Sequence, residues 1–148
     1  MPEATTTIVC PTCATKNRVR PSPAGVPRCR VCHTLLPWIV EPTQDSFDEE
    51  IKASVAVLVD FWAPWCAPCR MVSPLVDRAG HEHAGKIKVV KLNVDEAPDI
   101  AGRYGVRGIP LLVLLVDGHE VARQAGAVPQ ATLHEWLAPY LEPAPDRG

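Results

Sequence analysis

The chain has 148 residues, of which 47% are apolar and 22% charged, and its net charge is −2. This length suits one domain with a small appendage, and the charge excludes a nucleic-acid binder that relies on bulk positive charge. The longest apolar run, residues 109–116, has eight residues, whereas a membrane span needs about 20, so we expect no membrane anchor. The first residues carry neither the basic nor the apolar stretch of a secretory signal, which favours a cytoplasmic protein.

All six cysteines occur in C-x-x-C pairs, and the first two pairs predict a zinc ribbon. Fifteen residues separate the first pair from the second, which fits the spacing of four-cysteine zinc sites. Two residues between cysteines form a tight turn that directs both sulfurs at one metal. Four thiolates complete tetrahedral coordination and leave no open position, so we expect a structural Zn²⁺. The expected ligands are Cys10, Cys13, Cys29 and Cys32.

Other interpretations of this cysteine-rich segment are two accidental pairs or two disulfides. Residues 29–33 also match the C-x-x-C-H pattern of c-type haem attachment, but haem would leave Cys10 and Cys13 unexplained. Residues 1–36 hold five basic side chains and one acid, for a charge of +4. A role as an adaptor that binds a protein or RNA therefore stays open for this module, although we expect no nucleic-acid partner for the whole chain.

The composition changes near residue 37, where apolar periodicity replaces the cysteine-rich pattern. We therefore divide the chain into a zinc-ribbon module, a second domain and a frayed tail rich in proline. The three parts are residues 1–36, 37–142 and 143–148.

The second domain alternates predicted strands with predicted helices. A valine-rich run predicts a strand that is buried on both faces of a sheet, and a turn at Asp117-Gly118 joins the last two strands. The first helix has Ser46 as its expected N-cap. This order indicates an α/β fold with a central mixed β-sheet flanked by helices. We expect strands at 55–62, 87–94, 111–116 and 120–124, and helices at 46–51, 66–83, 99–104 and 130–141.

The third cysteine pair predicts a redox centre. Cys66-Ala67-Pro68-Cys69 follows the buried strand and begins a helix, where Pro68 suits an early position. The helix dipole and free backbone N–H groups favour a thiolate at Cys66, and the thiolate is the attacking species in disulfide exchange. We expect Cys66 to be exposed, and Cys69, one turn inside the helix, to be shielded and to resolve the mixed disulfide.

Residues 59–70, Val-Asp-Phe-Trp-Ala-Pro-Trp-Cys-Ala-Pro-Cys-Arg, resemble the active site of thioredoxins. Further segments follow in thioredoxin order and spacing over about residues 38–142. With its cysteine-rich extension, the chain is similar to the thioredoxin-2 subfamily. The resemblance implies the thioredoxin fold preceded by a small zinc-ribbon module. The further segments are residues 91–96, 108–110, 117–118 and 126–129.

The resemblance also implies roles for individual residues. Asp60 is similar to the buried aspartate behind the cysteines, which takes and returns the proton of Cys69, and Lys91 is similar to its charge partner. Pro110 resembles the cis-proline that faces the disulfide, next to a backbone that pairs with substrate. A flat apolar patch around Cys66 is implied for Trp65, Ile109, Gly126 and Ala127.

The resemblance implies a protein-disulfide reductase that acts on disulfide-containing proteins and receives electrons from a thioredoxin reductase. We expect no bound nucleotide or flavin, because the glycines at 102, 105 and 108 do not form a dinucleotide-binding pattern. A disulfide oxidase or isomerase is the alternative enzyme, and a zinc-ribbon adaptor on a thioredoxin scaffold is the alternative of another class. Ala67 and Leu111 stand where thioredoxins usually have glycine and threonine. We expect these two differences to affect which partner proteins the chain binds.

Overall fold

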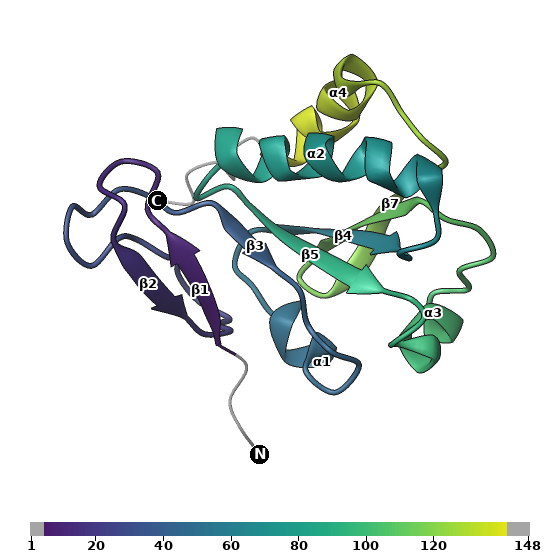
Figure 1. Cartoon of the computed structure of the whole chain (residues 1–148), viewed down its shortest axis with the longest axis horizontal. Helices are drawn as coiled ribbons and strands as arrows, with labels where there is room; N and C mark the ends of the chain where they lie inside the picture. The colour runs from purple at the N-terminus through teal and green to yellow at the C-terminus, as the bar shows by residue number, and fades with distance from the viewer. Residues whose placement is uncertain (1–4, 142–148) are drawn as a thin grey trace.

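The computed structural model describes residues 5–141, and the predicted tail at 143–148 lies outside this range. A five-stranded mixed sheet forms the centre of the molecule (Figure 1), with strand order β3-β5-β4-β6-β7. β3, β5 and β4 run parallel, whereas β6 pairs antiparallel with both β4 and β7. The predicted α/β class and central mixed sheet are confirmed. The strands of this sheet are β3 (Trp38–Val40), β4 (Ala56–Trp62), β5 (Ile87–Asn93), β6 (Leu111–Val116) and β7 (His119–Ala125).

Two helices cover each face of the sheet (Figure 1). α1 and α3 pack on one face through Phe47 and Ile100, and α2 and α4 pack on the other through residues such as Val76 and Leu137. Because β4 lies between two strands and two helical layers, six of its seven residues are buried, as its apolar run predicts. The helices are α1 (Phe47–Glu50), α2 (Ala67–Glu82), α3 (Pro98–Arg103) and α4 (Gln130–Leu141).

Two predictions concern a turn and the start of a helix. The predicted turn between β6 and β7 is confirmed, since Asp117 and Gly118 both have positive φ, at 53° and 80°. Ser46 is the N-cap of α1, as predicted, but its side chain makes no capping hydrogen bond. Its hydroxyl instead accepts a hydrogen bond from the backbone N–H of Thr43 at 2.9 Å.

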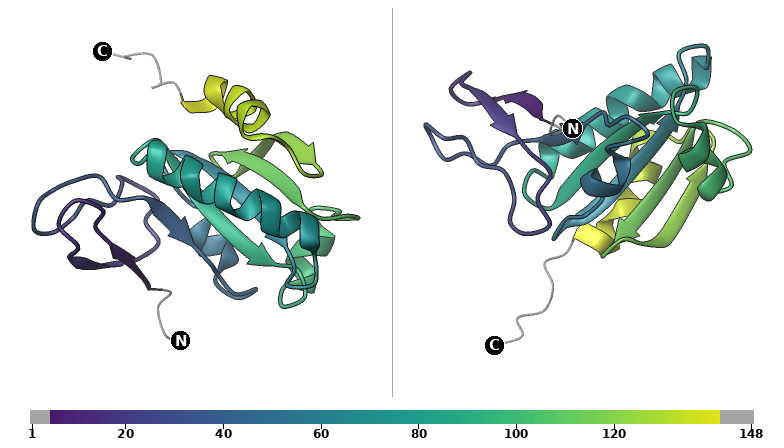
Figure 2. Two further views of the ribbon diagram at one scale, coloured as in Figure 1. Left: turned by 45° about the horizontal axis from the view of Figure 1, so that its top comes forward. Right: turned by 90° about the horizontal axis from the view of Figure 1, so that it is seen from below.

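The N-terminal segment forms an antiparallel hairpin of β1 (Thr6–Val9) and β2 (Lys16–Val19). This hairpin lies beyond the β3 edge of the sheet, at the end opposite β7 (Figure 2). The two parts share a core, because Ile8, Cys10 and Cys29 belong to the same buried cluster as Trp38. The cysteine-rich segment is therefore packed onto the sheet and does not hang from it as a separate body.

The turn between α2 and β5 shows how closely this packing fits. Gly85 has φ of +87°, and a Cβ at this position would lie 2.8 Å from a methyl group of Leu35. Only glycine meets both requirements without a shift of the neighbouring chain.

A buried ion pair lies under the junction of the two parts. Lys88 on β5 is fully buried, its Nζ donates to Glu50 Oε1 at 2.7 Å, and it lies 4.3 Å from the ring centroid of Trp38. Burial lowers the pKa of Lys88, and the bond to the Glu50 carboxylate opposes that shift. Two buried charges at the centre of a core are tolerated only when they form an ion pair with each other.

We therefore expect Lys88→Met to lower the free energy of unfolding by about 3 kcal/mol or more, because it leaves the Glu50 carboxylate buried without its cation. The matched control is Lys52→Met, which breaks the exposed pair with Glu49 and changes stability by less than about 0.5 kcal/mol. The double substitution Lys88→Met with Glu50→Gln recovers part of the loss. Urea unfolding followed by fluorescence measures all three, and equal effects at Lys88 and Lys52 would contradict the interpretation.

Candidate functional site

The third cysteine pair lies where β4 gives way to α2. Cys66 is the N-cap of α2, and the backbone N–H of Cys69 donates to its sulfur at 3.2 Å. Cys66 and Cys69 form a disulfide with their Cα atoms 5.3 Å apart. Pro68 stands at the start of the helix, where a missing N–H costs nothing. The N–H of Cys69 at this helix end therefore points at the sulfur that the sequence predicts to be the nucleophile.

The expected difference in exposure between the two cysteines is wrong for this disulfide state. Cys66 is 4% exposed and Cys69 is 3% exposed. Both are packed with Ala63 and covered by partly buried side chains that include Trp62 and Ile109. The disulfide holds the Cys66 sulfur against Cys69, under the loop that carries Ile109. Position relative to the helix end, and not exposure, therefore distinguishes the two sulfurs.

Asp60 is a buried carboxylate on β4. It is 1% exposed, and neither of its oxygens has a hydrogen-bond partner among residues 5–141. Burial raises its pKa to about 7, while the positive charge of Lys91 opposes the shift and the negative charge of Asp77 adds to it. A carboxyl group with such a pKa takes up or releases a proton near neutral pH, which is the property required of an acid–base group.

Lys91 lies opposite Asp60 in the register of β4 and β5 but makes its ion pair elsewhere. Its Nζ donates to Asp77 Oδ1 at 2.8 Å and to Ser73 Oγ at 2.5 Å, and both partners come from α2. The resemblance implied Lys91 as the charge partner of Asp60. The charge of Lys91 does lower the pKa of Asp60, but its direct ion pair is with Asp77.

Ser73 and Asp77 were missed in the sequence. They lie four residues apart on α2, so they share a helix face. That spacing is visible in the sequence, but it does not say which strand residue the face meets.

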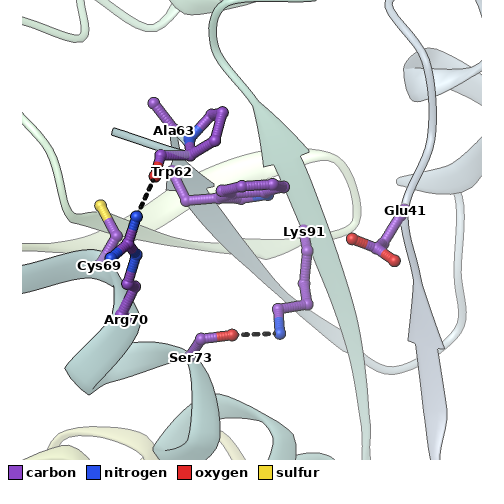
Figure 3. Close-up of a pocket in the computed structure, with 8 residues that line it drawn as sticks. Glu41, Trp62, Ala63, Cys69, Arg70, Ser73 and Lys91 are labelled. Carbon is purple, nitrogen blue, oxygen red and sulfur yellow. Dashed lines mark hydrogen bonds between the residues drawn. The ribbon is translucent and has the colours of Figure 1, made fainter. Parts of the chain in front are cut away.

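A cavity of about 190 Å³ extends from Cys69 to Ser73 and Lys91 (Figure 3). Cys69, Ser73 and Lys91 line it together with the ring of Trp62, and Glu41 from the loop after β3 lies on its far side. The side chain of Arg70 closes one edge by donating to the carbonyl oxygen of Pro64 at 2.8 Å. Cys69 and Lys91 thus line one common cavity, whose walls are mainly apolar.

Of the residues predicted to form an apolar patch around Cys66, Ile109 packs against the cysteine pair. Trp65 is 67% exposed, and its indole N–H donates to Asp95 Oδ2 at 2.9 Å, which fixes the ring. The Ile109–Pro110 peptide bond is cis, and the Pro110 carbonyl accepts from the N–H of Gly126 at 2.9 Å. Ile109 is half-buried, whereas Gly126 and Ala127 are exposed. Met71, in the second turn of α2, is a further large apolar side chain that is exposed, with an exposed fraction of 70%.

The four remaining cysteines gather into one cluster. Their sulfurs all lie within 4.8 Å of one another, with 3.5 Å from Cys10 to Cys32 and from Cys13 to Cys29. A tetrahedral zinc with Zn–S bonds of about 2.3 Å requires sulfur separations of about 3.8 Å, which lies within this spread. All four are free thiols, so the structure does not contain the alternative pair of disulfides. The donor set and its spacing therefore fit a tetrahedral thiolate site.

The two halves of this cluster repeat one local geometry. In each, the N–H of the first cysteine donates to a threonine carbonyl five residues later, at 2.9 Å for Cys10 and 2.8 Å for Cys29. The residue after each second cysteine, Ala14 or His33, has positive φ, at 64° or 66°. The pKa of Cys29 is lowered to about 5, chiefly because the backbone N–H of Cys32 donates to it. His33 is exposed and is not one of the clustered ligands.

Comparison with known proteins identifies the family. The thioredoxin family model matches residues 27–139. The chain belongs to the thioredoxin family. It is 51% identical to thioredoxin 1 of Nostoc sp. over 100 residues, which are 67% of this chain and 94% of that protein. It is 53% identical to thioredoxin of Synechocystis sp. over 97 residues, which are 65% of this chain and 91% of that protein.

A plant protein gives a similar result. The chain is 50% identical to the chloroplastic M-type thioredoxin of Pisum sativum, over 65% of this chain and 56% of that protein. Thioredoxins are protein-disulfide oxidoreductases, and the Cys66–Cys69 disulfide of this member is the matching C-x-x-C pair. The thioredoxin match begins at residue 27, inside the segment assigned to the ribbon module, which agrees with the core that the two parts share.

No helix within residues 5–141 is long and apolar enough to cross a bilayer.

The raised pKa of Asp60 predicts how stability depends on pH. The native state holds the proton up to about pH 7 and the unfolded chain only to about pH 3.8, so stability falls as pH rises through this interval. Between pH 5 and pH 8.5 we expect the oxidised protein to lose roughly 3 kcal/mol of unfolding free energy from this group.

Asp60→Asn should abolish this loss of unfolding free energy between pH 5 and pH 8.5. Asp45→Asn, at an exposed position, should show the same loss as the wild type. Urea unfolding of the oxidised proteins at both pH values measures the difference. Parallel pH dependence of the wild type and Asp60→Asn would show that the carboxyl group is already ionised at pH 5.

The cysteine cluster predicts one tightly bound zinc per chain in protein purified under reducing conditions, because four thiolates close the coordination shell. Elemental analysis should find about one equivalent in the wild type and in Cys66→Ser, which leaves the cluster intact. Cys29→Ser should lose it, because three thiolates remain. Metal-free protein with two disulfides in the ribbon would contradict the site.

Proposed function

We propose that this protein is a reductase of protein disulfides that uses Cys66 as the nucleophile and Cys69 as the resolving thiol. The supporting observation is the placement of Cys66 at the N-cap of α2, where the Cys69 N–H donates to its sulfur. The same hydrogen bond and the helix dipole stabilise a thiolate once the disulfide is reduced. A thiolate at this end of the helix lies beside the apolar surface that carries Trp65, and a protein substrate would contact that surface.

In the first step, the Cys66 thiolate attacks one sulfur of the substrate disulfide. A bond forms between Cys66 and that sulfur, the substrate S–S bond breaks, and the other substrate sulfur leaves as a thiolate. Ile109 packs against the cysteine pair and precedes Pro110, and we assign its backbone the role of pairing with an extended substrate segment.

In the second step, Cys69 attacks Cys66 and releases the substrate as a dithiol. Cys69 must lose its proton first, and we assign the acceptor role to Asp60, whose pKa of about 7 suits transfer near neutral pH. Two electrons pass from the dithiol to the substrate, and the enzyme is left with the Cys66–Cys69 disulfide that the structure contains. Lys91, held by Asp77 and Ser73, tunes the proton affinity of Asp60 through its charge.

We further propose that a thioredoxin reductase returns the two electrons and that the protein works in the cytoplasm. Four free thiols in the ribbon require a reducing compartment, or zinc, to remain unoxidised. The zinc held by Cys10, Cys13, Cys29 and Cys32 is assigned a structural role. Bound there, it stabilises a segment too small to build its own core, and it takes no part in the exchange.

The order of attack predicts different behaviour for two variants. Cys69→Ser should accumulate mixed disulfides with substrate proteins, because the intramolecular displacement that releases them is lost. Cys66→Ser should accumulate almost none. Non-reducing gels and mass spectrometry of the linked peptides measure the yield and locate the bond. Linkage mainly through Cys69, or equal yields from both variants, would overturn the assignment.

A further inference from the structure

A second group of metal-ligating side chains lies away from both cysteine sites. Glu82 ends α2, His83 is the C-cap of that helix, and His134 lies in the second turn of α4. One ligand atom from each lies within 4.8 Å of the other two. We propose that Glu82, His83 and His134 form a second metal site, for a divalent transition metal such as zinc, that links the end of α2 to α4.

The two helices are held together without any metal. α2 and α4 pack side by side over the same face of the sheet, as both views show (Figures 1 and 2). Arg78 on α2 donates to the side chain of Gln130 at the start of α4, at 2.6 Å. Leu133, the neighbour of His134 in the chain, is buried in the core below. The ligands are therefore brought together by packing that folding itself provides.

The distances suit a site that closes around an ion. The ring centroids of His83 and His134 lie 5.0 Å apart, and His134 Nδ1 lies 3.9 Å from Glu82 Oε2. Ligand atoms on one zinc lie about 3.4 Å apart at bond lengths of about 2.1 Å, so Glu82 and His134 must approach by about 0.5 Å, and no pair of ligand atoms by more than about 1.4 Å. The side chains of Glu82 and His134 are 43% and 52% exposed, which leaves them room to rotate.

An unpaired polar atom on His83 is an independent observation that supports metal binding at this cluster. The Nε2 atom of His83 is buried, and within residues 5–141 it has no hydrogen-bond partner. A buried polar atom without a partner costs free energy. Coordination of a metal ion would give the imidazole of His83 a polar interaction that no hydrogen bond supplies.

The ligand set identifies the class of ion. Two imidazoles and one carboxylate suit zinc and the neighbouring divalent transition metals better than Mg²⁺ or Ca²⁺, which prefer oxygen ligands alone. Three protein ligands leave a position for water, so this site binds more weakly than the four-thiolate cluster. An ion that binds only when α2 and α4 are docked stabilises the folded chain by mass action.

The test uses the full-length, untagged protein with one zinc in the ribbon and Cys66–Cys69 oxidised, so that no other thiol binds metal. Titration with Zn²⁺ by calorimetry should show one further equivalent, and Co²⁺ should give the absorption of a site with nitrogen and oxygen ligands. The thermal midpoint should rise with added Zn²⁺. His134→Ala should abolish the second equivalent and the rise in midpoint, and Glu82→Gln should weaken binding at least about tenfold.

The matched control is His81→Ala, because His81 is an exposed histidine at the same end of α2 and lies outside the cluster. It should bind the second equivalent as the wild type does. His83→Gln provides a second ligand variant should His134→Ala fail to fold. The proposal is overturned if the wild type takes up no second equivalent at millimolar Zn²⁺, or if His81→Ala loses as much binding as His134→Ala.

Discussion

The burial of β4 on both faces is the constraint on which the redox centre depends. Six of its seven residues are buried, and the chain can leave such a strand only at its end, where it turns into α2. That turn places Cys66 at a helix N-terminus, where backbone N–H groups favour a thiolate. The same burial holds Asp60 away from water, so its pKa is raised. One packed strand therefore fixes both the position of the Cys66 sulfur and the buried carboxyl group of Asp60.

The ribbon extends that core and does not form a separate one. Two of its clustered cysteines are buried with Trp38, which in turn covers the buried Lys88–Glu50 ion pair. A change in the cysteine cluster would therefore alter the packing of the edge strand β3 before it altered the packing of β4. This continuity gives a physical reason for the proposed zinc in a domain whose redox chemistry needs no metal. An ion bound by the four cysteines would stabilise the side chains that cover a costly pair of buried charges.

Much of this arrangement could be predicted from the sequence, because its strongest signals are local. The valine-rich run of β4, the Asp117-Gly118 turn and the spacing of the cysteines each report a short-range geometry, and the structure contains all three. The partners of Lys91 and the burial of Cys66 depend on contacts across the sheet, which spacing does not report. Lys88 is the clearest example of burial that the sequence does not predict. A lysine in an alternating strand is usually exposed, whereas this one is fully buried.

The central claim is that the dithiol passes two electrons to protein disulfides, and turnover measures it most directly. The purified protein is mixed with NADPH, a thioredoxin reductase and insulin, and NADPH oxidation is followed as the insulin disulfides are reduced. The account predicts sustained NADPH consumption that depends on insulin and disappears in both Cys66→Ser and Cys69→Ser. A folded, zinc-loaded wild-type protein that supports no consumption above the variants, while a thioredoxin control does, would contradict it.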